Sequence, residues 1–229
     1  MATDNKTRLI EYFVDKILSG EMKTGERIPT EREIASSFGI SKTAAHSALE
    51  QLSQMGLIDV YPQSGSFVAD YLKTGDARTL EAIARYGISS LDFERLLAIL
   101  DIRIAIEGMA FRRICERRTD EDLEFLKSKV AGIAERIKNG ISPEELSEDF
   151  FKWHREVFIR SKSEMLPLFI NALHDISIPF WITYFKMCGP DGAVKLLNDF
   201  TDCIEKKDGD RACALMNDGI DKYLRYISK

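Results

Sequence analysis

No stretch of this sequence is apolar enough to cross a membrane. The most apolar stretch, residues 176–185, is about half of the roughly 18 to 20 uncharged residues that a spanning helix requires. Residues 1–8 are polar and no apolar segment follows a basic start, so we expect no signal peptide and no membrane partner. We therefore expect a cytoplasmic protein.

Cysteine, histidine and the short motifs of enzymes are also scarce. The 229 residues include four cysteines without a CxxC pair and three histidines, which favours buried, reduced thiols over a disulfide or metal framework. The sequence lacks a P-loop, GxGxxG, GxSxG and HExxH, so we expect neither an enzyme nor a cofactor. Hydrophobic residues make up 45% and charged residues 30%, a composition that excludes a disordered chain and indicates globular domains.

The first 70 residues open with three short helical patterns. Apolar residues recur at helical spacing over residues 9–18. Thr30 and Glu33 have the spacing of a capping box, which predicts the start of a second helix. Ser41 is placed to cap a third helix, which we expect to end at Gly56.

Two short strand patterns follow these helices. Residues 57–61 and 66–69 are rich in strand-forming residues, and residues 62–65 between them have turn composition. Three short helices followed by a hairpin are the layout of a winged helix-turn-helix, which we predict for residues 1–70.

The rest of the chain has helical periodicity throughout. The predicted fold is mainly α: the winged helix-turn-helix is joined by a linker at residues 71–77 to an all-α helical bundle domain at residues 78–229. Pro167 and Pro179 fall inside one predicted helix, so we expect a break or kink there. The predicted helices cover 76–87, 91–117, 119–138, 142–161, 164–187, 190–207 and 209–227.

Several motifs of the first domain, in the same order, resemble the signature of GntR-type transcription regulators. The helical remainder, including the segment from Asp101 to Glu107, resembles the effector-binding domain of the FadR-like subfamily. The resemblance implies an N-terminal domain that binds operator DNA and a helical domain that dimerises and senses a small molecule. The motifs are Pro29 to Ala35 (PTEREIA), Phe38 to Thr43 (FGISKT), Ala48 to Leu52 (ALEQL), Gly56 to Ile58 (GLI) and Gly65 to Val68 (GSFV).

Short polar and cationic side chains stand where such a domain would meet DNA. They occupy the first turn of the predicted third helix, the start of the second helix and the tip of the hairpin, which suit base edges and phosphates. An ordinary solvated face would have the same residue types. The predicted contacts to double-stranded operator DNA are Arg32, Ser41, Lys42, Thr43, His46, Gln63, Ser64 and Gly65.

Two of these positions depart from the family pattern, which usually has arginine at both. Lys42 lacks the bidentate fork of arginine, and His46 is mostly neutral at pH 7. His46 either meets a phosphate, so that binding strengthens as the pH falls from 8 to 6, or reads a base as a neutral imidazole, and the phosphate alternative is favoured.

Residues 1–70 carry seven Lys or Arg against ten Asp or Glu, a net charge of −3, so we expect the placement of charge to matter more than its total. One such domain cannot supply a specific affinity of about 10⁻⁸ M, and we therefore expect a homodimer on two half-sites.

Many proteins of the family bind a divalent metal through an aspartate and a histidine four residues later, but this sequence departs from that pattern. Phe150 occupies the aspartate position, and Asp149 lies five residues before His154. His174 is the other candidate ligand, and the later family histidines fall near Leu197 and Gly219, so we expect no metal.

An organic effector site is predicted instead. Arg103 and Glu107 lie one turn apart on an apolar segment, where a guanidinium facing a cavity would clamp a carboxylate or phosphate. An ion pair with Asp101 at the surface or between helices would fit the same residues. The predicted site for a small anionic effector comprises Arg103, Glu107, His154 and Tyr184.

The predicted function is that of a ligand-responsive, DNA-binding transcription regulator. Two alternatives of other classes fit parts of the sequence. One is a helical-bundle enzyme with an accessory winged helix, which metal-dependent activity would favour. The other uses the winged helix as a protein-interaction module, which the acidic balance of residues 1–70 would favour.

Overall fold

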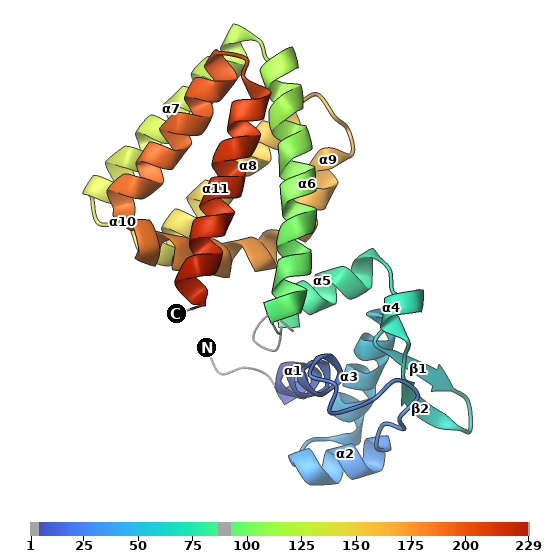
Figure 1. Ribbon diagram of the computed structural model, residues 1–229. Coiled ribbons are helices and arrows are strands. Elements are labelled where there is room, and N and C mark those ends of the chain that lie inside the picture. The colour runs from blue at the N-terminus through green and yellow to red at the C-terminus, as the bar shows by residue number, and fades with distance from the viewer. Residues whose placement is uncertain (1–4, 87–92, 229) are drawn as a thin grey trace. The chain divides into compact units, whose positions relative to one another are not determined.

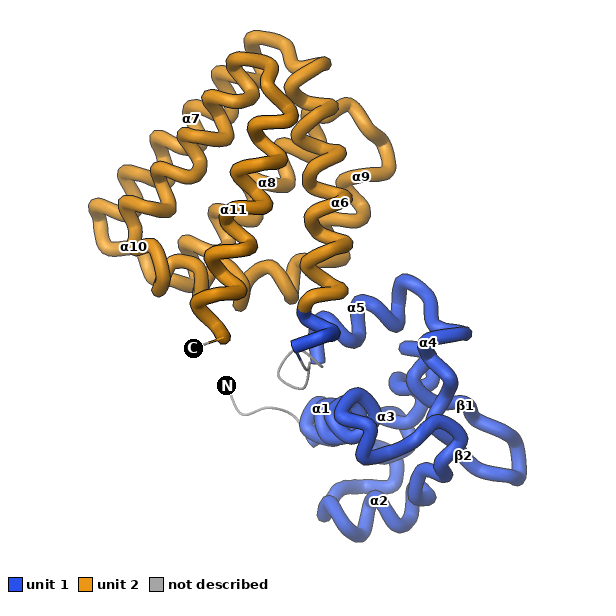
Figure 2. The backbone as a smooth tube through the Cα atoms, in the orientation of Figure 1, with its two compact units in different colours: residues 1–96 blue, residues 97–229 orange. Residues whose placement is uncertain are grey.

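The computed structural model describes residues 5–86 and 93–228. These residues form two compact units, residues 1–96 and residues 97–229 (Figure 2). Helices dominate both units, and a single hairpin of two strands belongs to the first (Figure 1). Within the described residues, no helix has the length and apolar character needed to cross a bilayer.

Three helices build the core of the first unit: α1 (Asn5–Leu18), α2 (Glu31–Phe38) and α3 (Lys42–Gln54). The apolar stripe predicted over residues 9–18 is confirmed, because all of its large apolar side chains are buried against the core. The stripe consists of Leu9, Ile10, Phe13, Val14, Ile17 and Leu18.

Hydroxyl side chains fix the starts of α2 and α3. The Glu33 amide donates to Thr30 Oγ1 at 3.4 Å, and the Thr30 amide donates to the Glu33 carboxylate at 2.7 Å, which completes the predicted capping box. The Ala44 amide donates to Ser41 Oγ at 3.1 Å at the start of α3. Gly39 ends α2 with a left-handed φ of 64°, which glycine adopts without steric cost.

The predicted hairpin is present as β1 (Ile58–Tyr61) and β2 (Gly65–Val68). The strands are antiparallel, with Ile58 opposite Val68 and Tyr61 opposite Gly65. Arg27 forms an isolated bridge with Phe67 on the other edge of β2, so the segment before α2 lies beside the hairpin. The predicted winged helix-turn-helix is therefore the fold of this part of the chain.

The first compact unit extends beyond residue 70. The short helix α4 (Tyr71–Thr74) lies in the segment expected to be a linker. The helix α5 (Ala77–Tyr86) packs against α1, with Ala82 buried in the same cluster as the core of the three helices. The division between units falls between Leu96 and Leu97, within α6 (Phe93–Arg117).

The second unit is a helical bundle, as predicted, and its described residues contain no strand. It contains most of α6, followed by five further helices. These are α7 (Asp120–Lys138), α8 (Pro143–Arg160), α9 (Leu166–Ala172), α10 (His174–Glu205) and α11 (Gly209–Ile227).

The break expected within the helix predicted over residues 164–187 is present, because α9 ends and α10 begins at Leu173, between the two prolines. Pro167 lies in the first turn of α9, where its missing N–H is unneeded. Pro179 lies inside α10 with helical backbone angles, so the break is not at this proline itself. A second interruption lies at Gly189, between the helices predicted over residues 164–187 and 190–207, and its φ of 70° and ψ of 172° form the corner visible in Figure 1.

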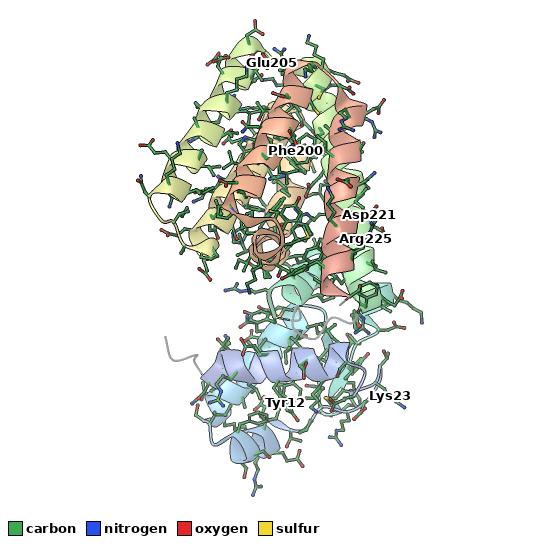
Figure 3. All side chains as sticks on the ribbon, turned by 60° about the vertical axis from the view of Figure 1, so that its left-hand side comes forward. Tyr12, Lys23, Phe200, Glu205, Asp221 and Arg225 are labelled. Atoms are coloured by element: carbon green, nitrogen blue, oxygen red, sulfur yellow. The ribbon has the colours of Figure 1, made fainter. Side chains whose placement is uncertain are left out.

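Large aromatic side chains fill the bundle. The Phe111 ring of α6 stacks on Phe200 of α10, with ring centroids 4.5 Å apart. Phe200 lies among the side chains that the helices enclose, as Figure 3 shows. Trp153 of α8 is 1% exposed and lies 6.2 Å from the Phe200 ring, so three helices meet at this point.

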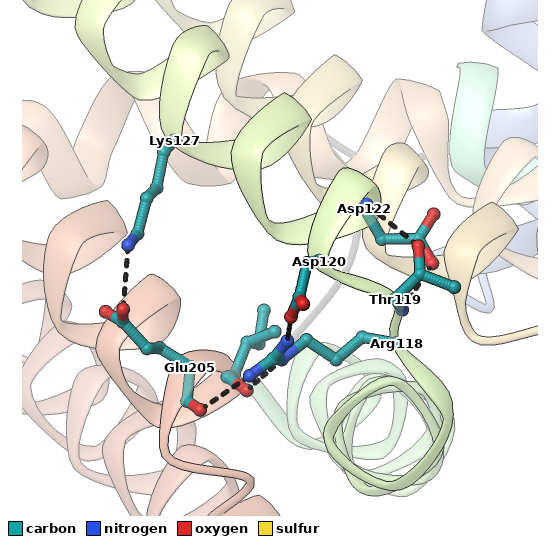
Figure 4. A network of polar contacts seen from close by, with 7 residues as sticks. Arg118, Thr119, Asp120, Asp122, Lys127 and Glu205 are labelled. Atoms are coloured by element: carbon teal, nitrogen blue, oxygen red, sulfur yellow. Dashed lines mark hydrogen bonds and ion pairs between the residues drawn. The ribbon is translucent and has the colours of Figure 1, made fainter.

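An arginine joins the start of α7 to the end of α10 (Figure 4). Arg118 donates to the carbonyl oxygens of Ile204 at 3.1 Å and Glu205 at 2.9 Å. The last carbonyls of a helix lack partners within the helix, so the guanidinium satisfies them and complements the negative end of the helix dipole. Arg118 also pairs with Asp120 at 2.7 Å.

A buried carboxylate joins α7 to the end of α8. Asp122 accepts from the Thr119 amide at 2.9 Å in a capping box, and it pairs with Arg160 at 2.7 Å and Lys162 at 2.9 Å. Desolvation opposes ionisation of this carboxyl, but the Thr119 amide and the two cations outweigh it and hold the pKa of Asp122 well below its usual range. The ionised carboxylate is therefore the form that stabilises the fold.

We predict that Asp122→Asn destabilises the helical unit by about 2 kcal/mol at pH 7. Because the folded-state pKa is depressed, this stabilisation is present above the unfolded-state pKa of about 4 and is lost as the pH falls below it. The difference between wild type and variant should therefore narrow in acid. Urea unfolding followed by tryptophan fluorescence measures it, since both tryptophans, Trp153 and Trp181, lie in this unit.

Asp120→Asn is the matched control, because the Asp120 side chain is 99% exposed. This substitution should lower the free energy of unfolding by less than about 0.5 kcal/mol. Equal losses for the two variants would contradict the role given to Asp122.

Candidate functional site

A groove of about 770 Å³ lies in the first unit between α2, α3 and the hairpin. Five of the eight residues predicted to contact DNA line it: Arg32, Lys42, His46, Gln63 and Gly65. Seven of the eight are exposed, and Gly65 is half-buried.

Three predicted residues, Ser41, Thr43 and Ser64, are exposed but do not line the groove. Ser41 uses its hydroxyl to cap α3, which makes it a positioning residue for the helix start.

Arg27 is a cation in this groove that the sequence did not indicate. Gly65 has a φ of 113°, and a Cβ atom there would lie 3.1 Å from Arg27 Nε. Glycine therefore lets the guanidinium lie against the hairpin. The bridge between Arg27 and Phe67 creates this proximity, and residues 40 positions apart give no local pattern that predicts it.

Two carboxylates also line the groove, and one of them contacts predicted DNA-binding residues. Glu31 Oε1 lies 2.7 Å from His46 Nδ1, and Glu31 Oε2 lies 3.8 Å from Lys42 Nζ. Glu50 accepts from Gln54 Nε2 at 3.5 Å. The charges in the groove are therefore mixed, with Arg27 and Arg32 supplying further positive charge.

All four predicted effector residues meet at one buried cavity in the second unit. Arg103, Glu107, His154 and Tyr184 line it together with Phe180, Trp181 and apolar residues of α10 and α11. The cavity volume is about 20 Å³, which holds about one water molecule. Sequence reasoning missed Phe200, Leu215, Met216 and Ile220, whose helical spacing resembles that of any core residue.

Arg103 forms an ion pair inside this cavity wall. Its Nε donates to Glu107 Oε1 at 2.5 Å, and the Arg103 side chain is 2% exposed. The guanidinium carbon lies 4.4 Å from the Phe180 ring centroid and 5.3 Å from that of Trp181. Asp101 is exposed and is not part of this pair, so the surface ion pair weighed from the sequence is not the arrangement found.

Three polar atoms of the cavity residues have no hydrogen-bond partner among the described residues. They are Arg103 Nη1, Trp181 Nε1 and His154 Nε2. Burial lowers the pKa of His154, so its ring is neutral. Because His154 Nδ1 lies 3.0 Å from the Phe150 carbonyl oxygen and donates to it, Nε2 is an acceptor. Two donors and one acceptor are thus available to a ligand.

The other groups around the cavity do not supply a metal site. Asp149 pairs with Arg136, and His174 pairs with Glu148 at 3.0 Å and Asp175 at 2.8 Å, so neither joins His154. Phe150 at the family's aspartate position packs against Phe185 with ring centroids 4.7 Å apart. In the described part of the chain, no group of three or more His, Cys, Asp or Glu side chains has an arrangement that could hold a metal ion, and the residues present do not fit a divalent metal.

Two known protein families match this chain, one in each part. Residues 5–68 match the family described as "Bacterial regulatory proteins, gntR family". Residues 98–222, more than half of the chain, match the FCD domain. The chain is a GntR-family transcription regulator with an FCD effector-binding domain. The predicted resemblance is confirmed, and the enzyme alternative has no support from the family.

Individual relatives are named as HTH-type transcriptional regulators. The HTH-type regulator YieP of Escherichia coli is 26% identical over 208 residues, which cover 89% of this chain and 87% of YieP. The HTH-type regulator Rv0494 of Mycobacterium tuberculosis is 34% identical over 119 residues, and the match spans 52% of this chain and about half of that protein (48%). The solved structure of Lar from Listeria monocytogenes shares the fold, with a TM-score of 0.65, 14% identity and coverage of 97% and 96% of the two chains.

Proposed function

We propose that this regulator binds operator DNA through the groove of its first unit and changes its DNA affinity when a small organic anion enters the cavity of its FCD domain. The observation that carries the proposal is the exposed set of cations at the starts of α2 and α3 in a domain of the GntR family. We propose that it acts in the cytoplasm, because the DNA that it binds is there.

Phosphates and guanine edges are the natural partners of the groove cations. Arg32 and Lys42 lie in the first turns of α2 and α3, and both side chains are exposed. Thr43 and Ser64 stand outside the groove, where short hydroxyl side chains suit phosphate contacts. Gln63 has a left-handed φ of 63° at the hairpin tip, and this tip is the proposed minor-groove or backbone contact.

A dimer is the proposed DNA-binding form. Arg27, Arg32 and Lys42 are few cations for one half-site, and Glu31 and Glu50 offset part of their charge. Specific protein–DNA complexes have dissociation constants of about 10⁻⁸ to 10⁻¹¹ M. An affinity of this size requires contacts from two copies of such a domain. Two chains per operator is the stoichiometry that the proposal requires.

The cavity chemistry supports an anionic effector. Arg103 Nη1 and Trp181 Nε1 can both donate to a carboxylate, and His154 Nε2 can accept from a hydroxyl or amide. Since the cavity holds about one water molecule, a larger ligand must displace side chains. A ligand carboxylate would compete with Glu107 for the guanidinium, and this exchange is the proposed switch.

For the DNA contacts, we predict that Arg32→Ala and Lys42→Ala each weaken operator binding about tenfold or more. Each should also reduce the slope of log K against log salt by about one unit per lost phosphate contact. Fluorescence anisotropy of a duplex recovered by selection from a random pool measures both quantities. Lys73→Ala is the control, because Lys73 is exposed on α4 outside the groove, and slopes that equal this control would rule the two contacts out.

For the effector, we predict that some member of a panel of small carboxylates raises the melting temperature of the FCD domain by about 5 °C at a hundredfold excess over Kd. The same compound should change DNA affinity. Replacing both charges together, Arg103→Met with Glu107→Leu, should keep the fold and abolish the response.

The single variant Glu107→Leu is the contrast, because it leaves a buried guanidinium unpaired and should cost about 3 kcal/mol. A double variant that folds and still responds to the compound would show that the ligand binds elsewhere.

A further inference from the structure

Glu31 is the feature of the groove that DNA binding alone does not explain. It is the first residue of α2, but the capping box of this helix uses Thr30 and Glu33. A carboxylate beside DNA repels phosphates, so its presence in the groove weakens non-specific attraction. Its contacts with His46 and Lys42 of α3 indicate what it does there.

Glu31 determines which nitrogen of His46 carries the proton. The distance of 2.7 Å between Glu31 Oε1 and His46 Nδ1 is that of a hydrogen bond. An ionised carboxylate can only accept, so Nδ1 is the donor. A neutral imidazole has a single N–H, and Nε2 is therefore left as an acceptor. The His46 side chain is 63% exposed, and Nε2 has no partner among the described residues.

This arrangement restricts the DNA groups that His46 can meet. Phosphate oxygens and the major-groove edge of guanine offer acceptors, which a neutral Nε2 cannot satisfy. The exocyclic amines of adenine (N6) and cytosine (N4) are donors and fit it. The Lys42 side chain, one turn earlier on the same face of α3, is 73% exposed and remains available to acceptors.

We propose that Glu31 is a specificity-determining residue, which fixes His46 in the Nδ1–H form so that its Nε2 selects an adenine or cytosine amino group in each half-site. The proposal rests on the proposed placement of the first turn of α3 against the bases. It assigns the base-reading alternative to His46 and the phosphate and guanine contacts to Lys42 and Arg32.

The first test needs no DNA. Nitrogen-15 NMR of the full chain at pH 8 distinguishes the two neutral forms of an imidazole, with His46→Ala to assign the signal. Wild type should show His46 protonated on Nδ1, and Glu31→Gln should show a mixture or the Nε2–H form. Protonation of His46 on Nε2 in the wild type would overturn the proposal.

The second test measures base preference at pH 8 on a duplex selected from a random pool by the wild type. Each base pair of a half-site is varied in turn. Wild type should discriminate about tenfold for adenine or cytosine at one position, whereas Glu31→Gln and His46→Ala should each reduce this to under about threefold. The double variant should lose no more than either single variant, because the two residues act as one unit.

Glu50→Gln is the matched control, because it removes the same charge from the same groove and Glu50 pairs with Gln54. Both Gln variants should raise affinity for random DNA about threefold by removing a charge near the phosphates, but only Glu31→Gln should lose the base preference. Retained preference in Glu31→Gln overturns this inference alone. A wild type that selects no duplex at all overturns the proposed function itself.

Discussion

Two hydroxyl caps determine where α2 and α3 begin, and the function of the first unit depends on those two points. Thr30 and Ser41 each accept a backbone N–H from the first turn of the helix that follows. The first turns of both helices consequently face one groove, and the chain places Arg32 on one and Lys42 on the other. A shift of either start by one residue would rotate these side chains by about 100° around the helix axis and away from the groove.

The two units differ in how far their charged side chains are exposed to solvent. In the first unit the charged side chains of the groove are at least partly exposed to solvent, and Arg27, Arg32 and Lys42 outnumber Glu31 and Glu50. In the FCD domain the Arg103 and Glu107 pair is desolvated, and any group that disturbs it changes the stability of the core. Loss of one partner from this buried pair therefore costs more stability than loss of one partner from an exposed pair.

The sequence predicts those features of the structure that depend on residues close together in the chain. The α1 stripe, the Thr30 and Ser41 caps and the hairpin follow from patterns within about ten residues, and the structure has all of them. The pairing of Glu31 with His46 and the approach of Arg27 to Gly65 depend on how the helices and hairpin pack, and no local pattern specifies that.

The breaks in the helical domain are predicted, but the exact residue of the first break is not. Pro167 and Pro179 are the conventional signals for a helix end, but the first lies in an opening turn and the second is tolerated inside α10. The corner at Gly189 lies at the predicted boundary between residues 187 and 190, and it uses a backbone conformation that glycine permits. Likewise, the four predicted effector residues share one cavity, but the closure of that cavity to about 20 Å³ depends on side chains from α10 and α11.

Hydrogen–deuterium exchange of the full chain, with and without a duplex that it selects from a random pool, tests the location of DNA binding most directly. The amides in the first turns of α2 and α3 lack partners within their helices, so a bound phosphate or base should slow their exchange. We expect protection of residues 29–46 and of the hairpin at residues 58–68, with Glu31 and His46 inside the protected segment. Protection that omits both segments and falls only on α7 to α11 would contradict it.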